Sequence, residues 1–167
     1  MNALLSSNPP SPIYKLQTSA PLKVALVEME GDPPENIPNI VRLLENPASP
    51  LALPGCTNLY VHDCLHIILG RAFSLDDEAF VVGFSMGTAR LCKAWHVALL
   101  KLASQTLYPQ NYQFQKQHLT TFDKGFAYAR SLARRDLHQF DFHTVEAFPV
   151  TQVRSLLGIN VEYCRSL

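Results

Sequence analysis

The segment from Thr57 to Thr88 constrains the fold more than any other part of the chain, because it places polar side chains on an otherwise apolar helix. His62 and His66 are four residues apart, so they point the same way on a helix. At ~100° per residue, Asp63 lies ~100° from His62 and ~60° from His66. Two imidazoles and a carboxylate on one side of a buried helix would be costly without a partner, and a metal ion is the partner that best satisfies them.

A fourth ligand is expected at Glu78, twelve residues after the second histidine. Ser74 is a good N-cap for a helix that begins at Leu75, and its first turn carries Asp76, Asp77 and Glu78. Helix capping by itself accounts for the two aspartates. Glu78 is different, because an antiparallel helical hairpin would bring it back beside the histidine pair. The predicted metal ligands are therefore His62, Asp63, His66 and Glu78.

Two imidazole nitrogens and two carboxylate oxygens suit Zn²⁺, and they suit Mn²⁺ or Fe²⁺ nearly as well. Such a site is close to neutral, which is compatible with apolar surroundings. A different interpretation stays open at this point, in which the two acids satisfy the histidines in a network that holds no metal. The spacing is not that of zincin proteases, which need a glutamate directly after the first histidine.

The sequence HDCLHIILG followed by DDEAFVVGF resembles the motif of the fourth ubiquinone (coenzyme Q) biosynthesis protein family. VRSLLGI, near the end, is similar to that family's closing arginine-x-x-leucine-glycine segment. The similarity covers most of Asn36 to Ile159, loosely outside the motif. Val145-Glu146 departs from the family's tryptophan-glutamate pair, and the chain is short for the family. The resemblance implies that a divalent metal, usually zinc, is bound by His62, Asp63, His66 and Glu78.

The resemblance also implies a function in polyprenyl-quinone biosynthesis. The family acts on a ring with a long polyprenyl tail, and is associated with a lyase-type oxidative decarboxylation that replaces the C1 carboxylate of a hydroxybenzoate by hydroxyl. It is also associated with organising other quinone-biosynthesis enzymes on a membrane. Zinc has no redox chemistry, so dioxygen would have to react directly with the ring, whereas iron could activate it. The alternative is a non-catalytic scaffold that binds a prenyl lipid. An open coordination position would favour the enzyme, and a saturated, inaccessible site would favour the scaffold.

Composition narrows the class of protein. The 167 residues are 47% hydrophobic and only 17% charged, which predicts a covered apolar surface such as a homodimer face, a lipid pocket or a side in peripheral contact with a membrane. The net charge of zero gives no electrostatic basis for binding nucleic acid. The four cysteines show no paired spacing and are expected to be reduced. No targeting or membrane-spanning segment is recognised, so we expect a cytoplasmic location or one peripheral to a membrane.

The predicted organisation is a flexible leader over residues 1–21 and one all-α helical bundle over residues 22–167. Leu22 to Met29 reads as a short helix or a strand, because periodicity does not separate the two. One long helix is expected from Leu75 to about Ser104. Further helices are expected over Ile37 to Glu45, Thr57 to Gly70, Leu119 to Leu137, and from Thr151 to a C-terminal stop at Gly158.

Two features outside the motif carry alternative interpretations. Gly83 and Gly87 form a strip of small residues, which indicates either close helix packing or the edge of an isoprenoid groove. Arg130, Arg134 and Arg135 suit the C-terminal end of a helix better than a site that binds an anionic lipid or substrate. The remaining histidines lack metal-ligand spacing and are expected to be structural or solvated; these are His96, His118, His138 and His143.

Overall fold

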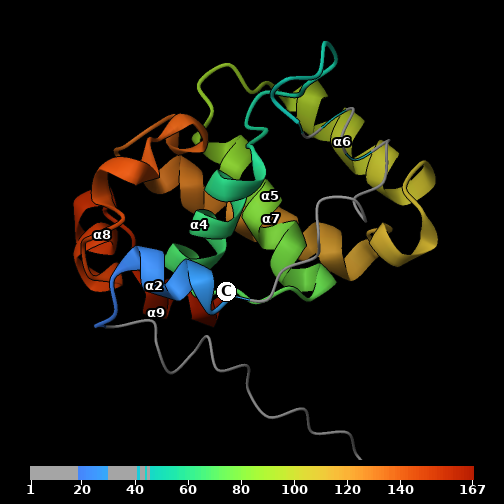
Figure 1. The fold of residues 1–167 in the computed structure, drawn as a ribbon. Helices are drawn as coiled ribbons and strands as arrows, with labels where there is room; N and C mark the ends of the chain where they lie inside the picture. Colours follow the sequence, from blue (N-terminus) through green and yellow to red (C-terminus); the bar gives the residue numbers. More distant parts are fainter. Residues whose placement is uncertain (1–18, 30–40, 42–43, 45) are drawn as a thin grey trace, which may run out of the picture.

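The structure is a computed structural model that describes residues 19–29, 41, 44 and 46–167. These residues form an all-α single-domain bundle of seven α-helices without a β-strand (Figure 1). The α-helices are α2 (Leu22–Val27), α4 (Leu59–Leu69), α5 (Leu75–Thr88), α6 (Ala94–Thr106), α7 (Lys116–Ser131), α8 (Val150–Leu157) and α9 (Val161–Ser166). Three 3₁₀ turns connect them: η2 (Gln110–Tyr112), η3 (Leu137–Gln139) and η4 (Phe142–Val145).

The centre of the bundle is the close contact between α5 and α7, which lie side by side in Figure 1. A Cβ atom on Gly83 would stand 2.2 Å from the carbonyl oxygen of Phe122, and one on Gly125 would stand 2.2 Å from the carbonyl oxygen of Phe80. A Cβ atom on Gly87 would stand 2.6 Å from the carbonyl oxygen of Phe126. The two backbones therefore touch through their glycines.

This contact corrects one interpretation of the glycine strip. Gly83 and Gly87 do not border an open isoprenoid groove, because the backbone of α7 fills the space in front of both residues. The strip is the packing surface of α5. Small residues are required there for the same reason that they occur at close helix crossings, since any side chain would push the two backbones apart.

The beginning and the end of the described chain pack together. Leu22 N–H donates to the Phe148 carbonyl at 3.0 Å, and Lys23 N–H donates to the Glu146 carbonyl at 2.9 Å. These bonds satisfy two of the free amide groups at the start of α2, which has no side-chain cap. The ambiguous segment at Leu22 is thus a helix, and it lies beside α4 and the C-terminal segment (Figure 1).

The prediction of one helix from Leu75 to about Ser104 is wrong, because α5 ends at Thr88 and α6 begins at Ala94. Tertiary hydrogen bonds compete for the backbone between them. The Thr88 carbonyl accepts from Asp136 N–H at 2.9 Å, and Arg90 N–H donates to the Asp136 side chain at 3.1 Å. A residue far along the chain therefore takes the groups that would have continued the helix.

The other boundaries differ in smaller ways. The helix expected over residues 119–137 is α7, which begins and ends earlier, and the last predicted helix is α8, closed by Gly158 at φ 72°. The sequence prediction did not include α9. Residues 1–18 of the expected leader lie outside the described residues, as does most of the helix expected over residues 37–45.

Candidate metal centre

The motif helix α4 is fixed at both ends by its own sequence. The Asn58 side chain accepts a hydrogen bond from Val61 N–H at 2.9 Å, which satisfies a free amide of the first turn. Gly70 adopts a left-handed conformation at φ 68° and ends the helix. Arg71 N–H then donates to the His66 carbonyl at 3.0 Å, so the chain reverses directly after the second histidine.

The next helix begins in the way that its sequence predicts. The Ser74 hydroxyl accepts from Asp77 N–H at 3.2 Å and caps α5. Asp76, Asp77 and Glu78 occupy the first turn, where free amides and the helix dipole favour carboxylates. The short reversal between α4 and α5 therefore returns Glu78 to the face of α4 that carries the histidines.

His62, His66 and Glu78 converge to form one cluster. The Nε2 atom of His62 lies 3.1 Å from Glu78 Oε2, and that of His66 lies 3.3 Å from Glu78 Oε1. The two Nε2 atoms are 3.0 Å apart. In the described part of the chain, no other three His, Cys, Asp or Glu side chains have ligand atoms close enough to share one ion.

These separations fit a bound cation. Ligand atoms held ~2.0–2.1 Å from a tetrahedral Zn²⁺ are ~3.3 Å apart. Hydrogen bonding satisfies the same contacts less well, because each neutral imidazole has at most one proton on Nε2. If His62 and His66 both donate to Glu78, their mutual contact of 3.0 Å has two donors and no acceptor. A cation accepts a lone pair from all three groups at once, so the residues present fit a divalent metal.

Burial and charge support the same reading of the cluster. Burial by itself raises the pKa of Glu78, but hydrogen bonds from His62 and His66 outweigh this effect and hold the pKa well below its ordinary value. Glu78 is therefore anionic at neutral pH, as a carboxylate that could bind a cation must be. His66 is fully buried, with its ring 5.0 Å from that of Phe73, while the side chains of His62 and Glu78 remain 21% and 29% exposed. The cluster is thus closed on one side and reaches solvent on the other.

Asp63, the fourth predicted ligand, is not part of the converging group. Its carboxylate oxygens are not among the ligand atoms that lie within 4.8 Å of one another, which belong to His62, His66 and Glu78. Burial raises the pKa of Asp63, and the charge of Glu78 raises it further, although His62 and His66 partly oppose the effect. Asp63 is therefore adjacent to the cluster and electrostatically coupled to it.

Two arginines that support the cluster were not assigned a role from the sequence. Arg154 on α8 is buried and donates to the carbonyls of Ile67 and Ile68 at 2.8 Å each, at the end of α4. Arg71 pairs with Asp77 at 3.5 Å and so connects the end of α4 to the start of α5. The signal for Arg154 was present in VRSLLGI, where one charged residue interrupts an apolar helix face.

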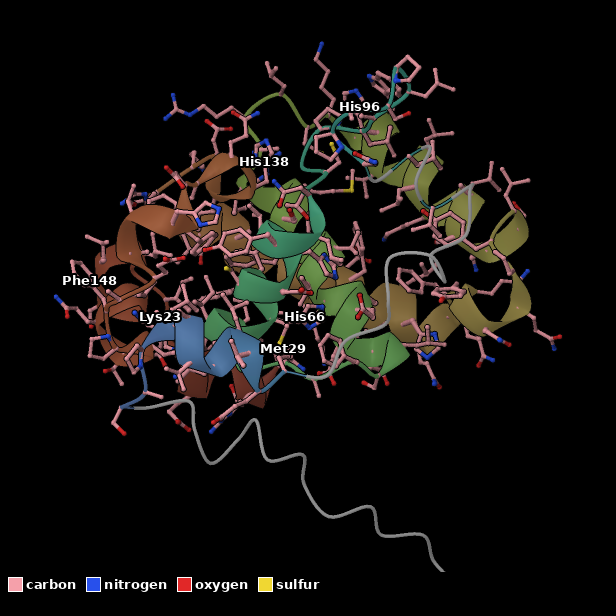
Figure 2. The ribbon with its side chains drawn as sticks, viewed as in Figure 1. Lys23, Met29, His66, His96, His138 and Phe148 are labelled. Carbon is pink, nitrogen blue, oxygen red and sulfur yellow. The ribbon has the colours of Figure 1, made fainter. Side chains whose placement is uncertain are left out.

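The remaining histidines lie outside the cluster. His96 and His118 cap their helices: each accepts on Nδ1 from a backbone N–H, of Lys93 at 2.9 Å and of Gln115 at 3.0 Å. His143 stacks on Tyr60 with ring centroids 4.1 Å apart. Figure 2 shows His96, His138 and His66 at well-separated positions. The basic end of α7 is likewise structural, since Arg135 donates to the carbonyls of residues 129 and 130 at that end of the helix.

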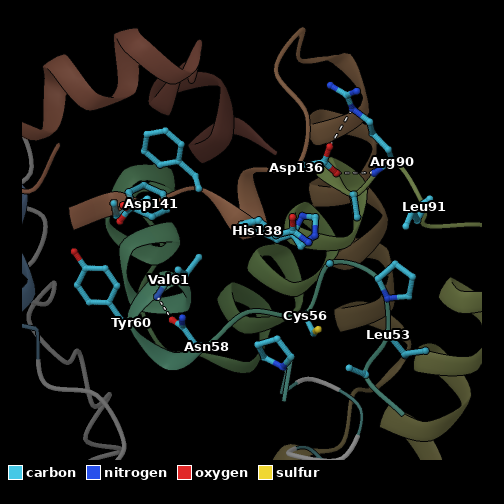
Figure 3. A pocket seen from close by; sticks show the side chains of 18 of the residues that line it. Leu53, Cys56, Asn58, Tyr60, Val61, Arg90, Leu91, Asp136, His138 and Asp141 are labelled. Carbon is cyan, nitrogen blue, oxygen red and sulfur yellow. Dashed lines mark hydrogen bonds and ion pairs between the residues drawn. The ribbon is translucent and has the colours of Figure 1, made fainter. Parts of the chain in front are cut away.

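A pocket of about 740 Å³ lies at the N-terminal end of α4, beside η3 and η4 (Figure 3). Apolar residues that line it include Leu53, Val61 and Phe142, and none of the three clustered side chains belongs to its lining. His138 also lines the pocket and is only 9% exposed, with Nδ1 unpaired. Burial lowers the pKa of His138 despite the nearby charge of Asp136, so this imidazole is neutral at pH 7.

In comparisons with known proteins, no family model, no curated protein and no solved structure matches the chain. No described helix is long and apolar enough to cross a membrane.

Proposed function

We propose that the chain is a metal-dependent component of ubiquinone (polyprenyl-quinone) biosynthesis that acts at C1 of a polyprenylated hydroxybenzoate ring. The observation that supports it most is the convergence of His62, His66 and Glu78 at separations suited to one divalent ion. The motif that contains these residues is also the one that resembles the quinone-biosynthesis family. Zn²⁺ is the ion that we propose, with Mn²⁺ and Fe²⁺ as the other ions that suit this set.

The proposed roles follow from the chemistry of the three side chains. His62 and His66 would supply neutral nitrogen ligands, and Glu78 would supply one anionic oxygen. A bound cation would provide Lewis-acid stabilisation for negative charge on the ring oxygens as carbon dioxide leaves. Asp63, beside the cluster, would orient a histidine or take up a proton, because its pKa is raised by burial.

Accessibility supports an enzyme rather than a closed structural site. Three protein ligands leave a tetrahedral ion one position for water or substrate, which is typical of catalytic sites. The partly exposed side chains of His62 and Glu78 place the cluster within reach of a ligand from solvent. A structural site would be expected to have four protein ligands and no opening.

A second candidate function is a non-catalytic scaffold that binds a prenyl lipid. The separate pocket at the start of α4 supports it, because its volume of about 740 Å³ lies in the range of small-molecule sites and much of its lining is apolar. In that case the metal would hold α4 against α5, and other biosynthetic enzymes would be the partners. Homodimer formation through part of the apolar surface is proposed with either function.

The first test is metal content, measured by elemental analysis on protein purified without a metal-affinity tag. We expect about one divalent ion per chain in the wild type, with the ion lost in His66→Ala and Glu78→Ala. Asp63→Asn should keep most of the ion, and His143→Ala is the matched control for an exposed histidine. Wild-type protein that stays metal-free after each ion is supplied would refute the metal site.

The reaction is tested with the metal-loaded protein, a polyprenylated hydroxybenzoate, a reductant and isotopically labelled dioxygen. The C1–carboxylate bond should break with release of carbon dioxide. One labelled oxygen should appear in the new ring hydroxyl, and the other should be reduced to water by two electrons from the reductant. Carbon dioxide release that is lost in Glu78→Ala would support the proposal that the protein is an enzyme. Tight substrate binding without turnover, unchanged in Glu78→Ala, would instead identify the scaffold.

A further inference from the structure

The His138 imidazole is a buried polar group that lacks a hydrogen-bond partner among the described residues. The residue is only 9% exposed, and its Nδ1 atom is fully buried and unpaired. Buried polar side-chain atoms in folded proteins are mostly hydrogen-bonded, because leaving one unpaired costs free energy. His138 also lines the pocket at the N-terminal end of α4, so its partner can be a molecule that enters this pocket.

The burial of Nδ1 decides which ring nitrogen of His138 carries the proton. A neutral imidazole has one N–H donor and one acceptor nitrogen. A proton on Nδ1 would be a buried donor without an acceptor, which is the more costly arrangement. The proton is therefore favoured on Nε2, on the side of the ring that is not enclosed. His138 thus offers the pocket a single uncharged N–H donor.

The walls of the pocket suit a flat ring. The pocket has a volume of about 740 Å³, which lies in the range of small-molecule sites (Figure 3). Aromatic side chains line it in two pairs: Phe140 meets Phe142 edge to face with centroids 4.9 Å apart, and Tyr60 stacks on His143 with centroids 4.1 Å apart. Aromatic side chains contribute a large apolar contact area and favour edge or offset contacts with a further ring.

The charges of the lining argue against a charged ligand. The charged side chains that the structure describes there are Arg90, Asp136 and Asp141. Arg90 pairs with Asp136 at 3.0 Å, whereas Asp141 forms no ion pair with the described residues and accepts a hydrogen bond from His143 N–H at 3.1 Å. Carboxylates therefore outnumber the guanidinium, and an anion would be repelled. A cation would be repelled by the N–H dipole of His138, since both would be donors.

We propose that this pocket binds an uncharged aromatic compound with a carbonyl oxygen, which accepts a hydrogen bond from His138 Nε2. The ring would lie against Tyr60 and Phe140. An isoprenoid chain by itself fits less well, because it has no acceptor for the histidine donor. None of the three clustered side chains lines the pocket, so the proposal does not rest on the metal centre or on the reaction proposed there.

Four benzene derivatives of similar size test the class of ligand: acetophenone, ethylbenzene, benzoate and benzylammonium. Each is titrated into the full-length protein, and binding is followed by the NMR signals of Leu53 and Phe142, which line the pocket. We expect acetophenone to bind saturably, and benzoate and benzylammonium to bind about tenfold more weakly or less. If acetophenone does not perturb these signals saturably, or if benzoate binds more tightly, the proposal is wrong.

Matched variants test the donor separately from the apolar walls. His138→Phe removes the N–H group and keeps a ring, so the ratio of acetophenone affinity to ethylbenzene affinity should fall about fivefold. His143→Phe makes the same exchange at an exposed residue of the lining and should keep the wild-type ratio. An unchanged ratio in His138→Phe, or an equal fall in both variants, would refute the role of His138.

The contribution of charge has its own variant. Asp141→Asn keeps the oxygen that accepts from His143 N–H and removes the negative charge. It should raise the affinity for benzoate about threefold and leave the affinity for acetophenone unchanged. Benzoate affinity that does not rise would contradict the assignment of anion exclusion to this carboxylate.

Folding is followed on the same samples by far-ultraviolet circular dichroism. If His138→Phe does not fold, the wild-type imidazole decides: its Nε2–H signal in ¹⁵N–¹H spectra should shift with acetophenone but not with ethylbenzene, and an equal response to both would refute the proposal. Glu78→Ala, which is expected to lose the metal ion, should bind acetophenone as the wild type does. Failure of the metal centre and failure of this site are thus told apart.

Discussion

Replacing Arg154 with methionine tests whether the C-terminal segment of the chain holds the motif helix in place. Arg154 is 4% exposed, and its guanidinium donates from Nε to the Ile68 carbonyl and from Nη2 to the Ile67 carbonyl, each at 2.8 Å. These carbonyls belong to the last turn of α4, after which the helix does not continue. The Ile67 carbonyl also accepts from Gly70 N–H at 3.2 Å. Methionine keeps most of the side-chain volume but has no donor.

The magnitude follows from two opposing effects. A hydrogen bond to a charged donor contributes about 1.5–3 kcal/mol, so the loss of two would cost about 3–6 kcal/mol. Removing the charge also removes a desolvation penalty, which is visible in the pKa of Arg154: burial, together with Arg165, lowers it to about 10. The two effects give an expected loss of about 2–4 kcal/mol in the free energy of unfolding.

The assay is urea unfolding of the wild type, Arg154→Met and Arg154→Lys, with Arg134→Met as the control. Arg134 is exposed and lies over the Phe140 ring at 4.7 Å, so its replacement should cost less than about 1 kcal/mol. Arg154→Lys should fall between wild type and methionine, because lysine keeps the charge but not the fork of donors. Metal affinity should drop with stability in Arg154→Met, because the same turn carries His66. An Arg154→Met protein within about 0.5 kcal/mol of wild type would refute the reasoning.

Three further predictions concern the contact between α5 and α7, the N-terminal cap of α4, and the pH dependence of stability. Gly83→Ala should lower the free energy of unfolding by about 3 kcal/mol in thermal or urea melts, because the new Cβ would meet the Phe122 carbonyl oxygen at 2.2 Å; unchanged stability would contradict the close contact. Asn58→Ala should cost about 1 kcal/mol by loss of the cap on Val61 N–H, and Asn58→Asp should restore it. Burial lowers the pKa of His138, so the unfolded chain binds its proton more tightly, and stability should fall as pH drops below ~6.5; His138→Leu should flatten this dependence between pH 5 and pH 7, measured by urea midpoints, and an equally steep curve would count against it.

The candidate site was partly predictable because most of its parts are local in sequence. His62 and His66 share a helix face by periodicity, Ser74 marks the start of the next helix, and the acids of the first turn follow from capping. The direction of the Asp63 side chain could not be read from the spacing, because a separation of ~100° on one helix leaves the meeting point undefined until a second helix is placed. The structure groups His62, His66 and Glu78 without Asp63.

The single long helix was mispredicted for a related reason. Nothing in the sequence near Thr88 breaks a helix, because no proline or glycine follows it before Ala94. The break comes from Asp136, which bonds the Thr88 carbonyl and the Arg90 amide from a distant part of the chain. Such competition between local propensity and a tertiary hydrogen bond is invisible in a local pattern.

The sequence by itself determined the helical class, both ends of α4, the start of α5, and the histidine and glutamate positions that could bind a metal. Each of these depends on periodicity or on a cap, and both act over a few residues. Only the tertiary structure decided that the glycine strip meets α7, that Arg154 holds the end of α4, and that His138 lines a pocket. These depend on which surfaces of distant helices meet, and close packing fixes that choice only when the whole chain is folded.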